Sequence, residues 1–236
     1  MKKLTAVLLA AALLAPAALF AANFEGKVRF KITTGKNAQD LDYSIKDGLA
    51  RLDLQTNETS AAVIINPTRQ EVTILMAEQK VYMVQPIAGK AAAAKNADAS
   101  DVSFEKTTVT EKILGYDCTK YVAKTKDSTS EIWATEQLGA FMGMGPGMDG
   151  GGMAEMFGGG RKTAAPGAQP WETALAQKDF FPLRVVSQTA KNKETMRMEA
   201  TAVEKKSLPA TDFAPPAGWQ KFDMGAMMRG LMPGGR

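Results

Sequence analysis

The stretch that decides the fold is residues 24–32, FEGKVRFKI, in which apolar and charged side chains alternate. Phe24, Val28, Phe30 and Ile32 share one parity of the chain, and the residues between them include Lys27, Arg29 and Lys31. Successive side chains of a β-strand point to opposite faces of its sheet. This period of two therefore predicts a half-buried strand with one apolar and one charged face.

The same alternation continues outward from this stretch. Leu41, Tyr43 and Ile45 alternate with polar residues, Asp47-Gly48 follows, and the pattern resumes at Ala50, Leu52 and Leu54. An Asp-Gly pair between two alternating runs is typical of a two-residue hairpin. Residues 61–65 and 81–84 are apolar at nearly every position. Strand 81–84 is therefore expected where both faces of the sheet are covered.

Further strand signals stand at 102–110, 118–125, 129–135, 183–188 and 195–203, whereas helix candidates occur only near 138–157 and 171–178. This is too little helix to cover a wide sheet, and no separate second set of strands is evident. We predict a mainly β protein with a curved antiparallel sheet or half-barrel, one or two short helices, and a Met/Gly-rich insertion as a lid. The alternative is a compact sandwich without a cavity.

The two ends of the chain differ from this pattern. Lys2 and Lys3 precede an apolar run over residues 4–20 that ends in Ala21 and Ala22, and this run is shorter than the roughly 20 residues that cross a bilayer. We expect residues 1–22 to be a cleaved signal peptide and the protein to be periplasmic; a retained membrane anchor is the alternative. One domain is expected over 23–223, with the insertion at 137–170 and a Met/Gly-rich tail at 224–236.

Composition excludes several kinds of chemistry. The chain has no histidine and one cysteine, so it has no Ser-His or Cys-His pair, no His-ligated zinc and no internal disulfide. Removal of Lys2 and Lys3 leaves 27 basic against 25 acidic residues, dispersed along the chain. We therefore expect no nucleic-acid partner, no cofactor and no catalytic activity. The lone Cys118 is expected to be buried, with an intermolecular disulfide or a reactive thiol as alternatives.

Methionine is unevenly distributed. Nine of the 14 methionines lie in two glycine-rich windows, at positions 142, 144, 148, 153 and 156 and at 224, 227, 228 and 232. Flexible thioether side chains adapt to irregular apolar partners, which favours a movable lid over an apolar ligand. Methionine sulfur also suits Cu(I), so a copper site is the alternative, with candidate ligands Met142, Met144, Met148, Met227 and Met228. A disordered segment is consistent with the composition as well.

The apolar parity of the strands supplies candidate binding residues. We expect the inner face of the sheet and the lid to contact a lipid, an acyl chain or an acylated protein. The candidates are Phe30, Tyr43, Leu52, Ile74, Met83, Met142, Met144, Met196 and Met198. An envelope assembly protein that binds other proteins through a sheet edge or its tail is a further alternative.

Short segments carry a resemblance to a known family. They are Phe24-Glu25-Gly26, residues 115–121 (GYDCTKY), residues 131–135 (EIWAT) and Pro182-Leu183-Arg184. Over residues 24–223 the chain resembles the bacterial exported family called domain of unknown function 4412. Its pattern of sheet and lid, and its ending at residues 208–219, are similar to periplasmic lipoprotein carriers of the LolA type. That resemblance implies a half-barrel that holds acyl chains. Such carriers present an arginine inside the barrel, and no arginine here matches that motif.

Overall fold

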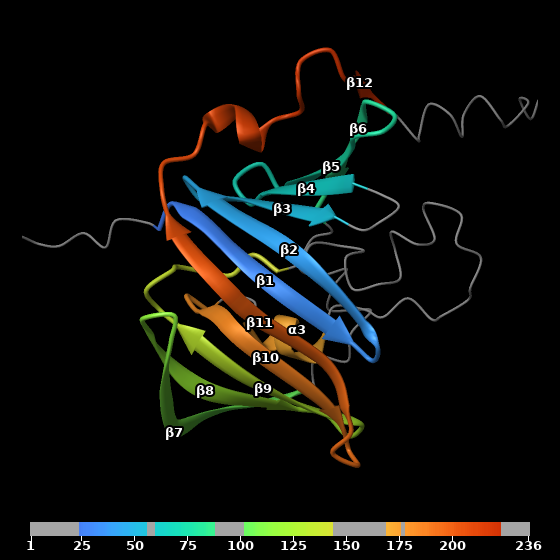
Figure 1. Ribbon diagram of the computed structural model, residues 1–236. Coiled ribbons are helices and arrows are strands. Elements are labelled where there is room, and N and C mark those ends of the chain that lie inside the picture. Colours follow the sequence, from blue (N-terminus) through green and yellow to red (C-terminus); the bar gives the residue numbers. More distant parts are fainter. Residues whose placement is uncertain (1–23, 56–59, 88–101, 144–168, 176–177, 223–236) are drawn as a thin grey trace, which may run out of the picture.

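The computed structural model describes residues 24–55, 60–87, 102–143, 169–175 and 178–222 (Figure 1). Within these ranges all strands belong to one sheet of twelve, in the order β12-β6-β5-β4-β3-β2-β1-β11-β10-β9-β8-β7. Their bounds are β1 Gly26–Thr34, β2 Asn37–Lys46, β3 Leu49–Gln55, β4 Ser60–Asn66, β5 Glu71–Met76, β6 Val81–Pro86, β7 Ser103–Ile113, β8 Tyr116–Lys124, β9 Ser128–Thr135, β10 Phe181–Thr189, β11 Glu194–Lys205 and β12 Gln220–Lys221.

The sheet consists of two meanders joined at the centre. Strands β1 to β6 follow one another in space, as do β7 to β11, and β1 pairs with β11 to connect the two series. All neighbours are antiparallel except β12, which runs parallel to β6. The sheet is curved and open (Figure 1), so the predicted curved antiparallel sheet is confirmed and the two-sheet sandwich is wrong for the described residues.

Two local conformations follow directly from the sequence. Asp47 and Gly48 have φ angles of 48° and 73°, which suits the two-residue turn between β2 and β3. Gly26 has a φ of 157°, and a Cβ there would collide with the backbone carbonyl of Glu204 and with the Phe24 ring. The glycine of the Phe24-Glu25-Gly26 segment is therefore needed for the close approach of β1 and β11.

The inner face of the sheet carries the main hydrophobic core. Phe30, Tyr43 and Leu52 are completely buried there, and helix α3 (Pro170–Leu175) contributes Trp171 and Leu175. Helix α3 contacts β8 and β9, and it lies behind the sheet in Figure 1. The helix expected near 171–178 is confirmed in part.

The segment after β9 is irregular. Residues 138–143 form no helix, contrary to the prediction of a helix over 138–157; the remainder of that range, 144–157, lies outside the described residues. Gly139 and Gly143 have φ angles of 76° and 83°, a left-handed conformation that is incompatible with a continuing right-handed helix.

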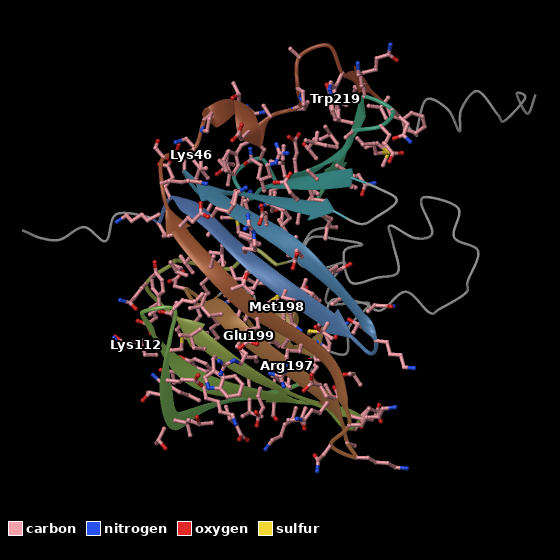
Figure 2. All side chains as sticks on the ribbon, in the orientation of Figure 1. Lys46, Lys112, Arg197, Met198, Glu199 and Trp219 are labelled. Atoms are coloured by element: carbon pink, nitrogen blue, oxygen red, sulfur yellow. The ribbon has the colours of Figure 1, made fainter. Side chains whose placement is uncertain are left out.

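A second hydrophobic cluster covers the outer face of β3 to β6. The chain leaves β11 and crosses this face as residues 206–222, which we call the strap, with a short 3-10 helix at Ala210–Phe213. Leu208, Phe213 and Trp219 of the strap pack against Ile64 and Leu75, and Figure 2 shows Trp219 near β6 and β12. Strand β4 is thus covered on both faces. In β6, Met83 is buried in the inner core and Tyr82 is half-buried in the outer cluster, so the prediction for residues 81–84 is confirmed in part. No helix in the described ranges has the length and apolarity to span a membrane.

Candidate functional site

A cavity of about 880 Å³ opens at one end of the inner face. Its apolar wall is formed by Phe24, Ile45, Leu138, Met142 and Phe180. These residues come from the start of the sheet, the β2 strand next to its turn, and the segments that precede β10. Segments far apart in the sequence therefore converge on one pocket, with a volume within the range of about 300–1,000 Å³ that is usual for ligand sites.

The mouth of this cavity is polar. Glu136, Lys178 and Asp179 line it, and all three are exposed. The cavity thus combines an apolar interior with a charged rim. This arrangement suits a ligand that has both an apolar part and a polar part.

Residues 138–142, which we call the wall segment, separate the cavity from an aromatic cluster. Four of these five residues line the cavity, whereas the ring of Phe141 packs into the core instead. Phe141 lies 5.3 Å from Tyr43, 5.5 Å from Phe181 and 5.8 Å from Trp171, measured between ring centroids. Phe141 is therefore the side chain that fills the space beside the cavity.

Two backbone hydrogen bonds hold the wall segment in place. The Phe141 amide donates to the Phe180 carbonyl oxygen at 3.0 Å, and the Met142 amide donates to the Tyr43 hydroxyl oxygen at 3.1 Å. Burial raises the pKa of Tyr43 well above its usual range, despite the hydrogen bond from Met142. The Tyr43 hydroxyl is therefore neutral and acts as a structural acceptor.

The predicted inner-face residues share one cluster. Phe30, Tyr43, Leu52, Ile74, Met83 and Met198 are buried in it, and Met196 and Met142 are half-buried against it. Of the predicted residues, Met142 lines the cavity, and Tyr43 lies behind it through its contact with the wall segment. Met144 lies outside the described residues.

Sequence analysis missed most of the cavity wall. Phe24 and Ile45 share the apolar parity of their strands, but nothing in one strand reveals that its end opens onto a cavity. Leu138 and Phe180 stand in segments without periodicity, so no pattern could have placed them beside the sheet.

Most of the candidate copper ligands lie outside the described residues. Met142 is described, and Met144, Met148, Met227 and Met228 lie outside the described residues. Among the described residues, no group of three or more His, Cys, Asp or Glu side chains gathers where it could hold a metal ion.

A second cavity, of about 520 Å³, lies between the outer face and the strap and is polar. Its cations are paired: Lys27 lies 3.1 Å from Asp42, Arg51 lies 2.6 Å from Asp53, and Lys206 lies 2.7 Å from Glu204. Burial alone would raise the pKa of Asp42, but hydrogen bonds from Arg29 and Lys27 hold it below its usual value. Because these cations already have partners, the apolar cavity is the better candidate site.

Cys118 is buried, as the sequence predicted. Desolvation raises the pKa of its thiol to about 11, and the thiol donates a weak hydrogen bond to the Tyr116 carbonyl at 3.7 Å. The thiolate, which is the reactive form, is therefore scarce at neutral pH.

A known family matches residues 24–219, from Phe24 of the cavity to Trp219 of the strap. The chain belongs to the family "Domain of unknown function (DUF4412)". The resemblance seen in the sequence is thereby confirmed, and the strap is part of the family's domain. The family's description names no activity. No curated protein matches the chain in sequence.

Several solved structures are similar to this member of the family. An uncharacterized conserved protein from Thermus thermophilus has 10% identity and a TM-score of 0.48, over 84% of this chain and 90% of that chain. A putative outer membrane lipoprotein-sorting protein domain from Vibrio parahaemolyticus has 10% identity and a TM-score of 0.30, over 80% and 87%. The MucA/MucB complex of Pseudomonas aeruginosa has 12% identity and a TM-score of 0.42, over 85% and 58%.

Proposed function

We propose that this protein is a non-catalytic periplasmic binding protein for an amphipathic ligand that carries an acyl chain, such as a lipid or an acylated protein. The observation that supports the proposal most is the cavity of about 880 Å³, with an apolar wall and a charged rim, at the end of the inner face. An acyl chain would lie against Phe24, Ile45 and Phe180, and its polar end would remain at the rim near Lys178.

The energetics are consistent with this proposal. Eight to ten buried methylenes would contribute roughly 6–8 kcal/mol. Displacement of the wall segment would break two hydrogen bonds, each with a net worth of about 0.5–1.5 kcal/mol. The same movement removes the Phe141 ring from the core, and association has its own entropic cost, so burial of the methylenes would offset these costs and leave only the surplus as affinity.

The exported location is part of the proposal. It rests on the apolar run over residues 4–20 after Lys2 and Lys3, which lies outside the described residues. Fractionation of the native host, followed by mass measurement of the mature chain, tests it. Recovery of an intact chain from the cytoplasm would contradict it.

The test of the binding function is native mass spectrometry of protein purified from its own envelope without detergent. Wild type and Phe222→Asp, which changes an exposed strap residue, should both carry a stoichiometric acyl-containing mass. Met142→Asp should lose that mass, because it places a charge in the apolar wall of the cavity. Bare wild-type protein that also takes up no lipid from vesicles would contradict the proposal.

The copper alternative gives a different result in the same experiment. A bound copper mass in place of an acyl mass would favour the methionine windows as a site. The assembly alternative predicts a large exposed apolar patch. In the described residues the exposed large hydrophobic side chains are Val109, Leu114 and Phe222; Val109 and Leu114 belong to β7 and the turn after it at one edge of the sheet and Phe222 follows β12 at the other edge, so the three do not form one patch.

A further inference from the structure

Trp171 has an unmet hydrogen-bond donor in the core. Its side chain is 1% exposed, and its indole Nε1 is the only buried side-chain nitrogen or oxygen in the described residues without a hydrogen-bond partner. Buried polar groups in proteins are nearly always paired. The buried hydroxyls of Ser130 and Ser187, for example, lie 2.8 Å apart and bond to each other. The exception at Trp171 therefore calls for an explanation.

The Trp171 indole is close to the cavity because it contacts Phe141 of the wall segment. Its ring centroid lies 5.8 Å from that of Phe141, and Phe141 belongs to the wall segment that lines the cavity. The two rings are stacked with 30° between their planes, so a ligand that takes the place of Phe141 contacts the indole ring, and its carbonyl oxygen must lie toward the edge of that ring to accept from Nε1. Gly139 and Gly143 flank Phe141 and have positive φ angles. Because glycine adopts many backbone conformations, rotation at these two residues would allow Phe141 to move.

We propose that the Trp171 indole N–H recognises a carbonyl oxygen of the bound ligand, which reaches it when Phe141 is displaced. This inference rests on the proposed function and specifies its ligand as an acyl ester. Indole nitrogen only donates, so its partner must be an acceptor. The indole is 1% exposed, and its ring neighbour Phe141 packs in turn against Tyr43 and Phe181, so water is excluded there, which disfavours an ionised carboxylate and favours a neutral ester carbonyl.

The first experiment compares two probes of equal chain length, a long-chain methyl ester and the corresponding alkane. Wild type should bind the ester about tenfold more tightly, because the alkane leaves the indole N–H unmet. In Trp171→Phe the ratio of ester affinity to alkane affinity should fall close to one, while the alkane affinity itself changes less than twofold. Trp219→Phe, at the half-buried tryptophan of the strap, is the control for the loss of an indole elsewhere and should keep the wild-type ratio of ester to alkane affinity.

Two further readouts distinguish recognition from a structural role. Trp171→Phe should lower the melting temperature of the ligand-free protein, because the smaller ring leaves a cavity in the core, but the loss of ester preference should persist at temperatures where the variant is fully folded. In a variant whose single tryptophan is Trp171, made by Trp133→Phe and Trp219→Phe, the ester should shift the fluorescence to longer wavelength and the alkane should not.

The outcomes are separable. Equal binding of ester and alkane by wild type, or an unchanged ratio in Trp171→Phe, would overturn the inference and leave the binding function standing. Binding of neither probe by folded wild type would contradict both. Where the ester preference is found, a diacyl phospholipid and a diacylated lipopeptide, tested for the same dependence on Trp171, distinguish the two sources of the acyl group.

Discussion

The strap and the wall segment cover opposite faces of one sheet, and they are held very differently. The strap is bonded along its whole length. The Leu208 amide donates to the Glu25 carboxylate at 2.6 Å, Arg51 donates to the Asp212 carbonyl at 2.7 Å, and the Gln220 amide donates to the Lys80 carbonyl at 3.0 Å. The described wall segment is held by two adjacent amides, those of Phe141 and Met142.

The difference indicates that the strap is a structural element and that the wall segment can move. Opening the strap requires the loss of bonds at three separated points and exposure of the outer cluster. Moving the wall segment requires the loss of two neighbouring hydrogen bonds and the exit of the Phe141 ring from the core, all at the edge of an existing cavity. Local openings of low free energy occur where few bonds must break together. We therefore expect the strap to unfold with the whole protein and the wall segment to open by itself.

The largest effect is expected at Phe213, the buried aromatic residue of the strap. Phe213→Ala should lower the free energy of unfolding by about 3 kcal/mol, because it leaves a cavity in the outer cluster. Urea unfolding measures this loss. Phe222→Ala, in the exposed part of the strap, is the control and should change it by less than about 0.5 kcal/mol. Equal losses in the two variants would contradict a structural role for the strap.

A smaller effect is expected at the hydrogen bond between Tyr43 and the wall segment. Tyr43→Phe removes the acceptor of the Met142 amide and should cost about 1 kcal/mol. Hydrogen exchange should become much faster at Met142, which loses its acceptor, whereas in the strap it should rise only by the roughly fivefold increase in global unfolding that about 1 kcal/mol implies. Tyr82→Phe, in the outer cluster, is the matched control. A uniform increase in exchange over the whole chain would show that the wall segment does not open independently.

Protonation of Glu25 at low pH should weaken the attachment of the strap to the sheet. The hydrogen bond from Lys46, together with the one from the Leu208 amide, holds the pKa of Glu25 below its ordinary value of 4.5. A carboxylate with a lowered pKa stabilises the fold fully above its ordinary pKa, and this contribution is lost as the pH falls through the lowered pKa. Stability measured against pH should therefore fall more steeply below about pH 5 in wild type than in Glu25→Gln. Parallel curves would contradict this role of Glu25.

The smallest effect is expected in the alkylation of the Cys118 thiol in the native protein. Because Cys118 is buried, its alkylation rate reports on global unfolding. With a thiol pKa near 11 and a buried side chain, it should resist alkylation at neutral pH in the native protein. Phe213→Ala, with its loss of about 3 kcal/mol, should speed alkylation about a hundredfold, and Tyr43→Phe, with its loss of about 1 kcal/mol, only about fivefold. Rapid alkylation of native wild type would show that the region around Cys118 opens easily.

Sequence reasoning predicted the sheet better than the site. The alternation from Phe24 to Ile32 and the Asp47-Gly48 turn were sufficient for β1 to β3, because period and turn chemistry are local. The same pattern placed Phe30, Tyr43 and Met198 on the inner face, where they are buried.

The remaining features depend on contacts between distant segments. The Tyr43 hydroxyl meets the Met142 amide 99 positions along the chain, and Phe24 meets Phe180 at the cavity only after the sheet has formed. The unmet donor at Trp171 is invisible in a sequence, because its lack of a partner is a property of the packed core. Local periodicity carries no information about contacts between residues that are far apart in the sequence.

The two edges of the sheet have a consequence for self-association. Parallel strand β12 occupies the edge of β6, where the Phe222 amide donates to the Tyr82 carbonyl at 2.8 Å. At the opposite edge, the register of β7 is interrupted between Lys106 and Thr110, and Thr107 donates its hydroxyl to the Lys120 carbonyl at 2.8 Å. A covered edge and an irregular edge are poor templates for a strand of another molecule. We therefore expect both edges to pair poorly with a strand of another molecule, and loss of β12 to expose the start of β6, at Val81 and Tyr82, to such pairing.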